Sequence, residues 1–298
     1  MHNFVKEFFT MTKPRVWIFL LITGIAGEIF SLAIRRYLDI WGFIYVTIYI
    51  TLGLMGAEAL SNYFDIDIDR KMSRTRNRAL PSGRMRPSVA LYGSIVLIAL
   101  TLILAIFRNF LSFLFMATGI FDYDIIYAFL LKKRTSLNII LGAYSGGAPL
   151  LAGFYAFTSS FNLLSILLFA IIIAWTPLHI WALSIKYRDD YASAEVPMLP
   201  VRRSTKQTMK ILFPISLLTS IITIIAGIEF RFYFPYWIGL GIVAVFSLLA
   251  VFLFVSYLRA YIDPEKRIMK LFGATNMFVG IFFILVAILS IAMPFVGV

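Results

Sequence analysis

Apolar residues recur along this chain of 298 residues in blocks of roughly 20, the length at which an α-helix crosses a hydrocarbon core about 30 Å thick. Apolar residue types make up 61% of the chain and charged residues only 14%, a balance that excludes a water-soluble globule. The sequence therefore predicts an all-α, polytopic membrane protein whose single domain covers residues 1–298. Nine spans are expected, at 16–34, 41–60, 89–107, 110–131, 137–157, 163–183, 209–228, 237–258 and 271–295.

Basic residues are distributed unevenly about these spans. Of the 27 lysines and arginines, 23 lie before the first span or in and directly beside the loops after the second, fourth, sixth and eighth spans. By the positive-inside rule these segments are cytoplasmic, so we expect a plasma-membrane protein with its amino terminus in the cytoplasm and its carboxyl terminus outside. The net charge of +12 is then largely a topology signal, and we expect a lipid bilayer but no nucleic acid as a partner. The long cytoplasmic loops 61–88 and 184–208 are expected to carry the functional site.

Carboxylates gather where the second span leaves the membrane. At about 100° per residue, Glu58, Asn62, Asp65 and Asp69 share one helix face, whereas Asp67 points elsewhere. Acidic side chains one turn apart are costly unless a cation binds between them, and hard oxygen ligands suit Mg²⁺. The face is therefore a candidate magnesium site. The alternative is an acidic loop start that pairs with the arginines after it.

A dense group of cations follows this face. Arginine has a planar fork that matches phosphate oxygens, and a topology signal needs far fewer charges than this loop carries. Carboxylates beside arginines at a membrane surface predict a site for a Mg²⁺-bridged diphosphate, and a plain basic loop that contacts lipid headgroups is the alternative. The cations lie within 17 residues and are Arg70, Lys71, Arg74, Arg76, Arg78, Arg84 and Arg86.

The later loop repeats part of this pattern. His179 stands between Trp175 and Trp181 near the end of the sixth span, and the carboxylates of Asp189 and Asp190 follow. A histidine flanked by tryptophans can lie against a large planar ligand, whereas a structural histidine beside interfacial tryptophans is the alternative.

Three further acids fall inside predicted spans. Glu28, Asp122 and Asp124 are expected to face the bundle interior or a cavity, although the sequence shows no partner for any of them.

With these motifs the chain resembles the UbiA superfamily of intramembrane prenyltransferases, and within it the haem O synthases. The resemblance covers nearly the whole chain, and N-Y-F-D-I-D-I-D-R-K-M-S-R-T-R-N-R at 62–78 contains the D-x-x-x-D and R-T-x-x-R pair that is specific to the superfamily. The segments P-L-H-I-W-A-L at 177–183 and V-P-M-L-P at 196–200 favour the haem branch over the quinone and archaeal-lipid branches. The pattern differs at Ser61, where relatives usually carry asparagine, and at Ile185, where many carry aspartate.

The resemblance implies a nine-helix bundle around a central cavity, in which Asp65 and Asp69 bind Mg²⁺ with the diphosphate of farnesyl diphosphate. Loss of diphosphate would give a farnesyl cation, a vinyl group of haem B would attack it, and addition of water would yield haem O for haem-copper oxidases. Haem B is then a substrate and not a cofactor. The side chains expected to neutralise the leaving diphosphate are Arg74, Arg78, Lys132, Lys133 and Arg134.

The resemblance also proposes residues around the acceptor and the metal. Tyr127, His179 and Trp181 are the expected wall for the porphyrin or the cation, Asn62 and Asp189 are further candidate metal ligands, and Asp190 is a candidate substrate contact. Haem A synthase is an expected partner.

Other functions stay open at this point. A UbiA-type enzyme acting on a quinone precursor or a glycerol-phosphate lipid would share most of the motifs. A transporter of an anionic substrate would explain buried acids and cytoplasmic arginines, but not paired carboxylates beside a phosphate-type cluster on one side only.

Overall fold

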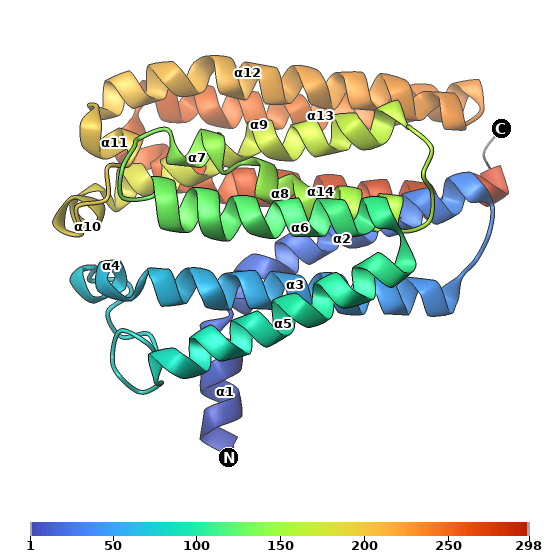
Figure 1. Ribbon diagram of the computed structural model, residues 1–298. Coiled ribbons are helices and arrows are strands. Elements are labelled where there is room, and N and C mark those ends of the chain that lie inside the picture. Colours follow the sequence, from blue (N-terminus) through green and yellow to red (C-terminus); the bar gives the residue numbers. More distant parts are fainter. Residues whose placement is uncertain (1, 297–298) are drawn as a thin grey trace.

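A computed structural model describes residues 2–296 of the chain, with side chains from residue 5 onward. In that part of the chain every regular element is a helix, and the long helices lie side by side in one bundle (Figure 1), which confirms the all-α prediction. The elements are α1 (His2–Met11), α2 (Pro14–Arg35), α3 (Ile40–Phe64), α4 (Ile66–Lys71), α5 (Pro87–Arg108), α6 (Phe110–Ile120), the π-helix η1 (Phe121–Leu131), α7 (Asn138–Leu141), α8 (Tyr144–Tyr155), α9 (Leu163–Lys186), α10 (Arg188–Ser193), α11 (Leu199–Arg202), α12 (Thr205–Phe230), the 3₁₀ turn η2 (Arg231–Tyr233), α13 (Tyr236–Ile262) and α14 (Pro264–Val296).

Eight helical stretches within residues 2–296 are long and apolar enough to cross a membrane, and α6 with η1 forms one of them. They match eight of the nine predicted spans. The exception is the predicted span 137–157, which is divided into α7 and α8 at Gly142 and Ala143. The prediction of one continuous helix there is wrong.

The divided segment nevertheless runs through the bundle from end to end. Near its start the side-chain amide of Asn138 donates to the carbonyl of Lys132 (3.2 Å), and just after α8 the carbonyl of Ala156 accepts from Arg108 Nε (3.1 Å). Lys132 and Arg108 flank opposite ends of the α6–η1 stretch. The described chain therefore makes nine passes, eight by continuous helices and one by a broken helix.

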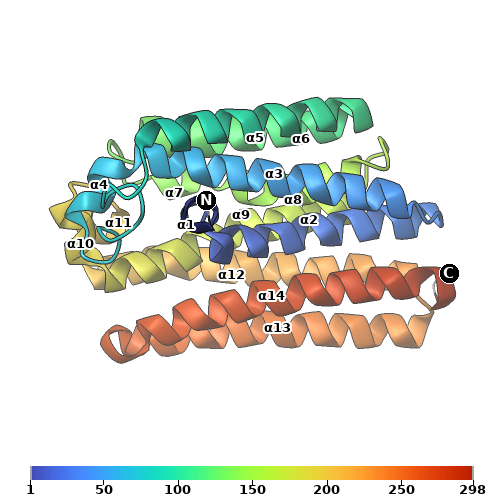
Figure 2. The same ribbon diagram turned by 90° about the horizontal axis from the view of Figure 1, so that it is seen from below.

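Small residues allow a close helix contact between α2 and α8. A Cβ on Gly27 would lie 2.2 Å from the carbonyl oxygen of Leu150, and one on Gly153 would lie 2.3 Å from that of Gly24. Only glycine permits this approach, as is common where membrane helices pack. Figure 2 shows α13 and α14 along one side of the bundle and α5 on the other, with α2 and α3 between them.

The two long loops meet at one end of the bundle, where α4, α10 and α11 lie together (Figure 1). The Asp190 carboxylate of the later loop accepts hydrogen bonds from the Ser73 hydroxyl of the earlier one, at 2.8 and 2.9 Å. We call this end, formed by residues 61–88, 132–137 and 184–208, the basic end. At this end Ser73 and Asp190 come together although they lie 117 residues apart in the sequence.

Candidate active site

The paired carboxylates lie at the basic end of α3. Asp65 stands between α3 and α4, and its carbonyl accepts from the Asp69 N–H (2.8 Å), so the helical path continues across the junction. This continuity keeps Asp65 and Asp69 one turn apart, and both side chains are buried. The Asp67 side chain is 77% exposed and pairs with Arg70 in solvent, as the helical spacing predicts.

Each buried carboxylate is held by a cation from a different segment. Lys132 Nζ lies 2.5 Å from Asp65 Oδ2, and Arg78 Nη1 lies 2.9 Å from Asp69 Oδ2. Burial alone would lower the pKa of Lys132, but the Asp65 carboxylate raises it above the ordinary lysine value, so the ammonium stays charged. The pair of Asp69 with Arg78 also realises the alternative that the sequence left open, in which the acids pair with the following arginines.

Oxygen atoms without partners mark the same face. Within the described chain, Asp65 Oδ1 and Asn62 Oδ1 are buried and make no hydrogen bond. The Asn62 amide nitrogen donates to the carbonyls of Met11 (2.6 Å) and Glu58 (2.9 Å), which fixes the side chain with its oxygen free. Buried polar atoms are rarely left unpaired, so these oxygens indicate a ligand.

The oxygen ligands on this face fit Mg²⁺. Two carboxylates and an amide oxygen are hard ligands, and Mg²⁺ in proteins is usually held by one or two carboxylates together with water and substrate phosphate. Among the described residues no group of three or more histidine, cysteine, aspartate or glutamate side chains is arranged to hold a metal. This face therefore suits a metal ion whose coordination is completed by a phosphate ligand, rather than a metal ion enclosed entirely by protein ligands.

The remaining predicted phosphate contacts lie in different surroundings. The Arg74 guanidinium lies 5.2 Å from the centre of the Tyr187 ring, and Arg74 faces the cavity described below. Lys133 and Arg134 are exposed at the basic end.

The two acids of the later loop have different environments. Burial opposes the shift, but hydrogen bonds from the Ser73 hydroxyl and the backbone N–H groups of Arg74 and Ser73 lower the pKa of Asp190 below its usual value. Asp190 thus joins the two loops. Asp189 is exposed, and no described contact connects it to Asp65 or Asp69.

A cavity of about 840 Å³ lies in the middle of the bundle, within the range of about 300–1,000 Å³ that is usual for small-molecule sites. Most of its wall is apolar, and the polar side chains include Glu58, Arg74 and Tyr123. Tyr127 connects the cavity to the carboxylates, because its ring lines the wall and lies 5.5 Å from Lys132 Nζ.

One wall of the cavity is aromatic. The His179 ring is stacked between Trp175, with ring centres 4.4 Å apart, and Phe272, at 4.6 Å. Tyr127 stacks on Tyr123, at 5.7 Å. Trp181 lies elsewhere: it is fully buried in the helix core and is not among the lining residues, so Trp175 is the tryptophan that the structure brings beside His179.

The intramembrane acids have separate surroundings. Glu28 accepts from the Thr47 hydroxyl (3.2 Å), and Asp122 accepts from the backbone N–H of Ser145 (2.9 Å). Glu58, at the cavity wall, accepts from the Tyr123 hydroxyl (2.9 Å). Neither carboxylate oxygen of the buried Asp124 has a hydrogen-bond partner among the described residues.

Sequence reasoning missed several cavity residues. Tyr123 stands four residues before Tyr127, a spacing that could have identified it. Phe272 carries no such signal, and neither does Thr275, the partner of His179 outside the cavity wall, because the sequence does not show that α14 packs against α9 at His179.

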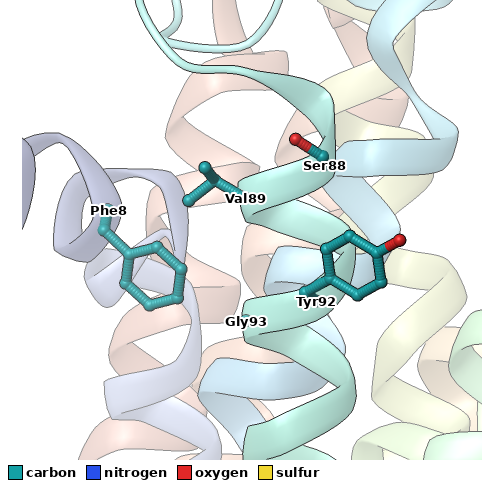
Figure 3. Close-up of a pocket in the computed structure, with 5 residues that line it drawn as sticks. All are labelled: Phe8, Ser88, Val89, Tyr92 and Gly93. Carbon is teal, nitrogen blue, oxygen red and sulfur yellow. The ribbon is translucent and has the colours of Figure 1, made fainter.

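A second hollow, of about 450 Å³, lies at the surface between α1 and the start of α5 (Figure 3). Phe8, Val89 and Gly93 form most of it, and the only polar side chains are those of Ser88 and Tyr92. It offers neither paired charges nor metal ligands, so the central cavity is the candidate active site.

Comparison with known proteins identifies the family of this chain. Residues 20–282 match the model of the UbiA prenyltransferase family. A protein named protoheme IX farnesyltransferase from Thermoplasma volcanium is 37% identical over 285 residues, which cover 95% of this chain and 97% of that protein. One named protoheme IX farnesyltransferase 1 from Picrophilus torridus is 38% identical over 290 residues, 97% of this chain and 96% of that protein.

Solved structures share the fold. A UbiA homolog from Archaeoglobus fulgidus bound to GPP and Mg²⁺ superposes with a TM-score of 0.77 at 16% identity, covering 97% of this chain and 99% of that one. A digeranylgeranylglyceryl phosphate synthase gives a TM-score of 0.74 at 18% identity and covers 99% of both chains. The family match, the full-length relatives and the shared fold lead to one conclusion: this chain is a multi-pass membrane protein that belongs to the UbiA prenyltransferase family.

Proposed function

We propose that this prenyltransferase is a haem O synthase, which transfers the farnesyl group of farnesyl diphosphate to a vinyl group of haem B. The C–O bond to diphosphate breaks, a C–C bond forms to the terminal vinyl carbon, and the inner carbon takes hydroxide from water while a proton is released. The observation that carries the proposal is the position of two buried, cation-paired carboxylates at one end of an apolar cavity with an aromatic wall. The names of the full-length relatives support haem as the acceptor.

The diphosphate end uses groups that are already paired in the free protein. Asp65 and Asp69, with the Asn62 amide oxygen, would hold Mg²⁺, which supplies positive charge to the leaving diphosphate when it is bound. Lys132 and Arg78 pair with these carboxylates and would also contact the diphosphate oxygens. Arg74, Lys133 and Arg134 would add positive charge from the surrounding loops. Fixed charges at the leaving group are the largest expected source of rate enhancement.

The acceptor end is apolar and aromatic. Tyr127, His179 and Trp175 line the cavity and would lie against the porphyrin or the allylic cation. An apolar wall limits water near the cation, so that the vinyl group reacts before water does. The predicted role of Asp189 as a metal ligand remains a prediction, and Asp190 would act by holding the two loops together.

The basic end would face the cytoplasm, and the lipid bilayer around the protein would be the plasma membrane. The product, haem O, would be passed to a haem A synthase partner and then to a haem-copper oxidase.

The test is a reconstitution of the purified chain in lipid nanodiscs with farnesyl diphosphate, haem B and Mg²⁺. We expect release of diphosphate and a porphyrin whose mass has increased by one farnesyl group and one hydroxyl group. Chelation of Mg²⁺ should stop both. Turnover with a quinone precursor or a glycerol-phosphate lipid but not with haem B would overturn the proposal in favour of another prenyltransferase. Release of no diphosphate with any acceptor would overturn the assignment of this reaction altogether.

A further inference from the structure

His179 is the only histidine among the residues that line the cavity, and the only other histidine of the chain, His2, begins α1. Both faces of the His179 ring are covered, by Trp175 from the same helix and by Phe272 from α14. The plane of the imidazole is therefore fixed, and only the edges of the ring remain for bonding.

One edge of the ring is bound to α14. His179 Nδ1 lies 2.9 Å from the Thr275 hydroxyl oxygen, and that hydroxyl donates its single hydrogen to the carbonyl of Phe272 (2.7 Å). Since a hydroxyl has one hydrogen to give, Thr275 must accept from His179, so Nδ1 carries the proton. No carboxylate contacts the ring in the described structure, and a half-buried imidazolium between two aromatic rings is costly without one, so the imidazole is neutral and Nε2 carries the lone pair.

The other edge opens to the cavity. No described residue forms a hydrogen bond with Nε2. Nε2 is also not one of the fully buried polar atoms that lack a hydrogen-bond partner. Because His179 lines the cavity, its lone pair is available to a ligand held there. A neutral imidazole that donates its far N–H to a fixed acceptor and offers its other nitrogen is the usual form of a histidine that binds a metal.

We propose that Nε2 of His179 is an axial ligand of the iron of the porphyrin substrate. The inference rests on the proposed function, because it requires haem in the cavity. An Fe–N bond to a fixed ring leaves the porphyrin free to turn only about that bond, so it limits which edge faces the diphosphate end. His179 thus positions the vinyl group rather than taking part in the bond changes.

The helix pair α9–α14 holds this ligand rigidly. Thr275 accepts from His179 through its hydroxyl, and its backbone carbonyl accepts from Trp175 Nε1 (2.9 Å). One residue of α14 thereby fixes both the proposed ligand and the ring stacked on it. The cavity wall also holds competing classes of iron ligand, namely thioethers and phenols. The thioethers are those of Met116 and Met269, and the phenols are those of Tyr123, Tyr127 and Tyr187.

The experiment titrates the untagged full chain in nanodiscs with haem B and, separately, with iron-free protoporphyrin IX, in the absence of farnesyl diphosphate. For the wild type we expect the absorption and electron paramagnetic resonance signature of histidine-ligated iron. His179→Phe keeps an aromatic ring in the stack and should lose that signature, with haem affinity about tenfold weaker or more, in line with the effect of losing metal-site interactions. His179→Met should give a sulfur-ligated spectrum, and His2→Phe should behave as the wild type.

Iron-free protoporphyrin IX separates ligation from packing. If His179 binds the iron, His179→Phe and the wild type should bind this porphyrin equally. An equal loss of affinity for both porphyrins in His179→Phe, or a wild-type spectrum in that variant, would overturn the inference. Prenylation of haem B by the wild type together with either result would leave the proposed function intact. A wild-type chain that neither binds nor prenylates haem B would overturn both.

Discussion

The contrast between Asp67 and its neighbours Asp65 and Asp69 gives the sharpest test at the scale of single residues. Asp65 and Asp69 are buried and paired with cations, whereas Asp67 is on the solvent side of the same helix. We expect Asp69→Ala to reduce turnover by about 100-fold or more, the size of effect found when a charge-stabilising group is removed. Diphosphate release at saturating substrate measures it.

Asp67→Ala is the matched control, since it removes a carboxylate from the same helix without touching the site. Its turnover should equal that of the wild type, and thermal unfolding in detergent should show both variants folded. A folded Asp69→Ala protein with normal turnover would contradict the role of this face.

The contact between helices α2 and α8 depends on glycine, which has no side chain. A Cβ at Gly27 would meet the Leu150 carbonyl oxygen at 2.2 Å, and backbone cannot move aside cheaply. We therefore expect Gly27→Ala to destabilise the protein by about 1–3 kcal/mol, the usual cost of overpacking, and to lower its thermal unfolding temperature by several degrees.

Gly241→Ala in α13 is the control, because a Cβ there meets nothing within 4 Å. That variant should be as stable as the wild type or slightly more stable, since alanine favours helix over glycine. Equal unfolding temperatures for Gly27→Ala and Gly241→Ala would show that the two helices can separate without cost.

The contact between the two loops of the basic end should depend on pH. The pKa of Asp190 is lowered in the folded protein, so its contribution is present above the ordinary aspartate pKa of about 3.9 and is lost as pH falls through the lower folded value. The hydrogen-exchange protection of residues 184–208, corrected for the intrinsic exchange rate at each pH, should therefore fall on acidification below about pH 4 in the wild type. In Asp190→Asn the loops should be looser at neutral pH and less sensitive to acid; an unchanged acid response would assign the effect to another group.

At the scale of the whole molecule, the absence of cysteine gives a clean test of orientation. Ser82 is exposed at the basic end, and Ser160 is exposed at the opposite end, beyond α8. We expect a membrane-impermeant thiol reagent added outside intact cells to label Ser160→Cys but not Ser82→Cys. The reverse pattern would place the basic end outside the cell and contradict the positive-inside assignment.

The apolar blocks and the helical spacing predicted much of this molecule. Block length located eight spans correctly, and a spacing of one turn identified Asp65 and Asp69 together and excluded Asp67, because these features depend only on local geometry.

Features that depend on distant contacts escaped prediction. The break at Gly142 follows from the close passage of that backbone past Tyr127, and the pairing of Asp65 with Lys132 depends on how η1 ends against α3. The choice of Trp175 over Trp181, in contrast, follows from local spacing: Trp175 stands one turn before His179 on the same helix face, whereas Trp181, two residues after it, points to another face.

The cavity takes part of its wall from α14, the last helix within residues 2–296, which supplies Phe272, Asn276 and the Thr275 bond to His179. During synthesis, all earlier helices can enter the bilayer while this wall is still missing. A nascent chain therefore has no enclosed place for a reactive intermediate until α14 has been inserted.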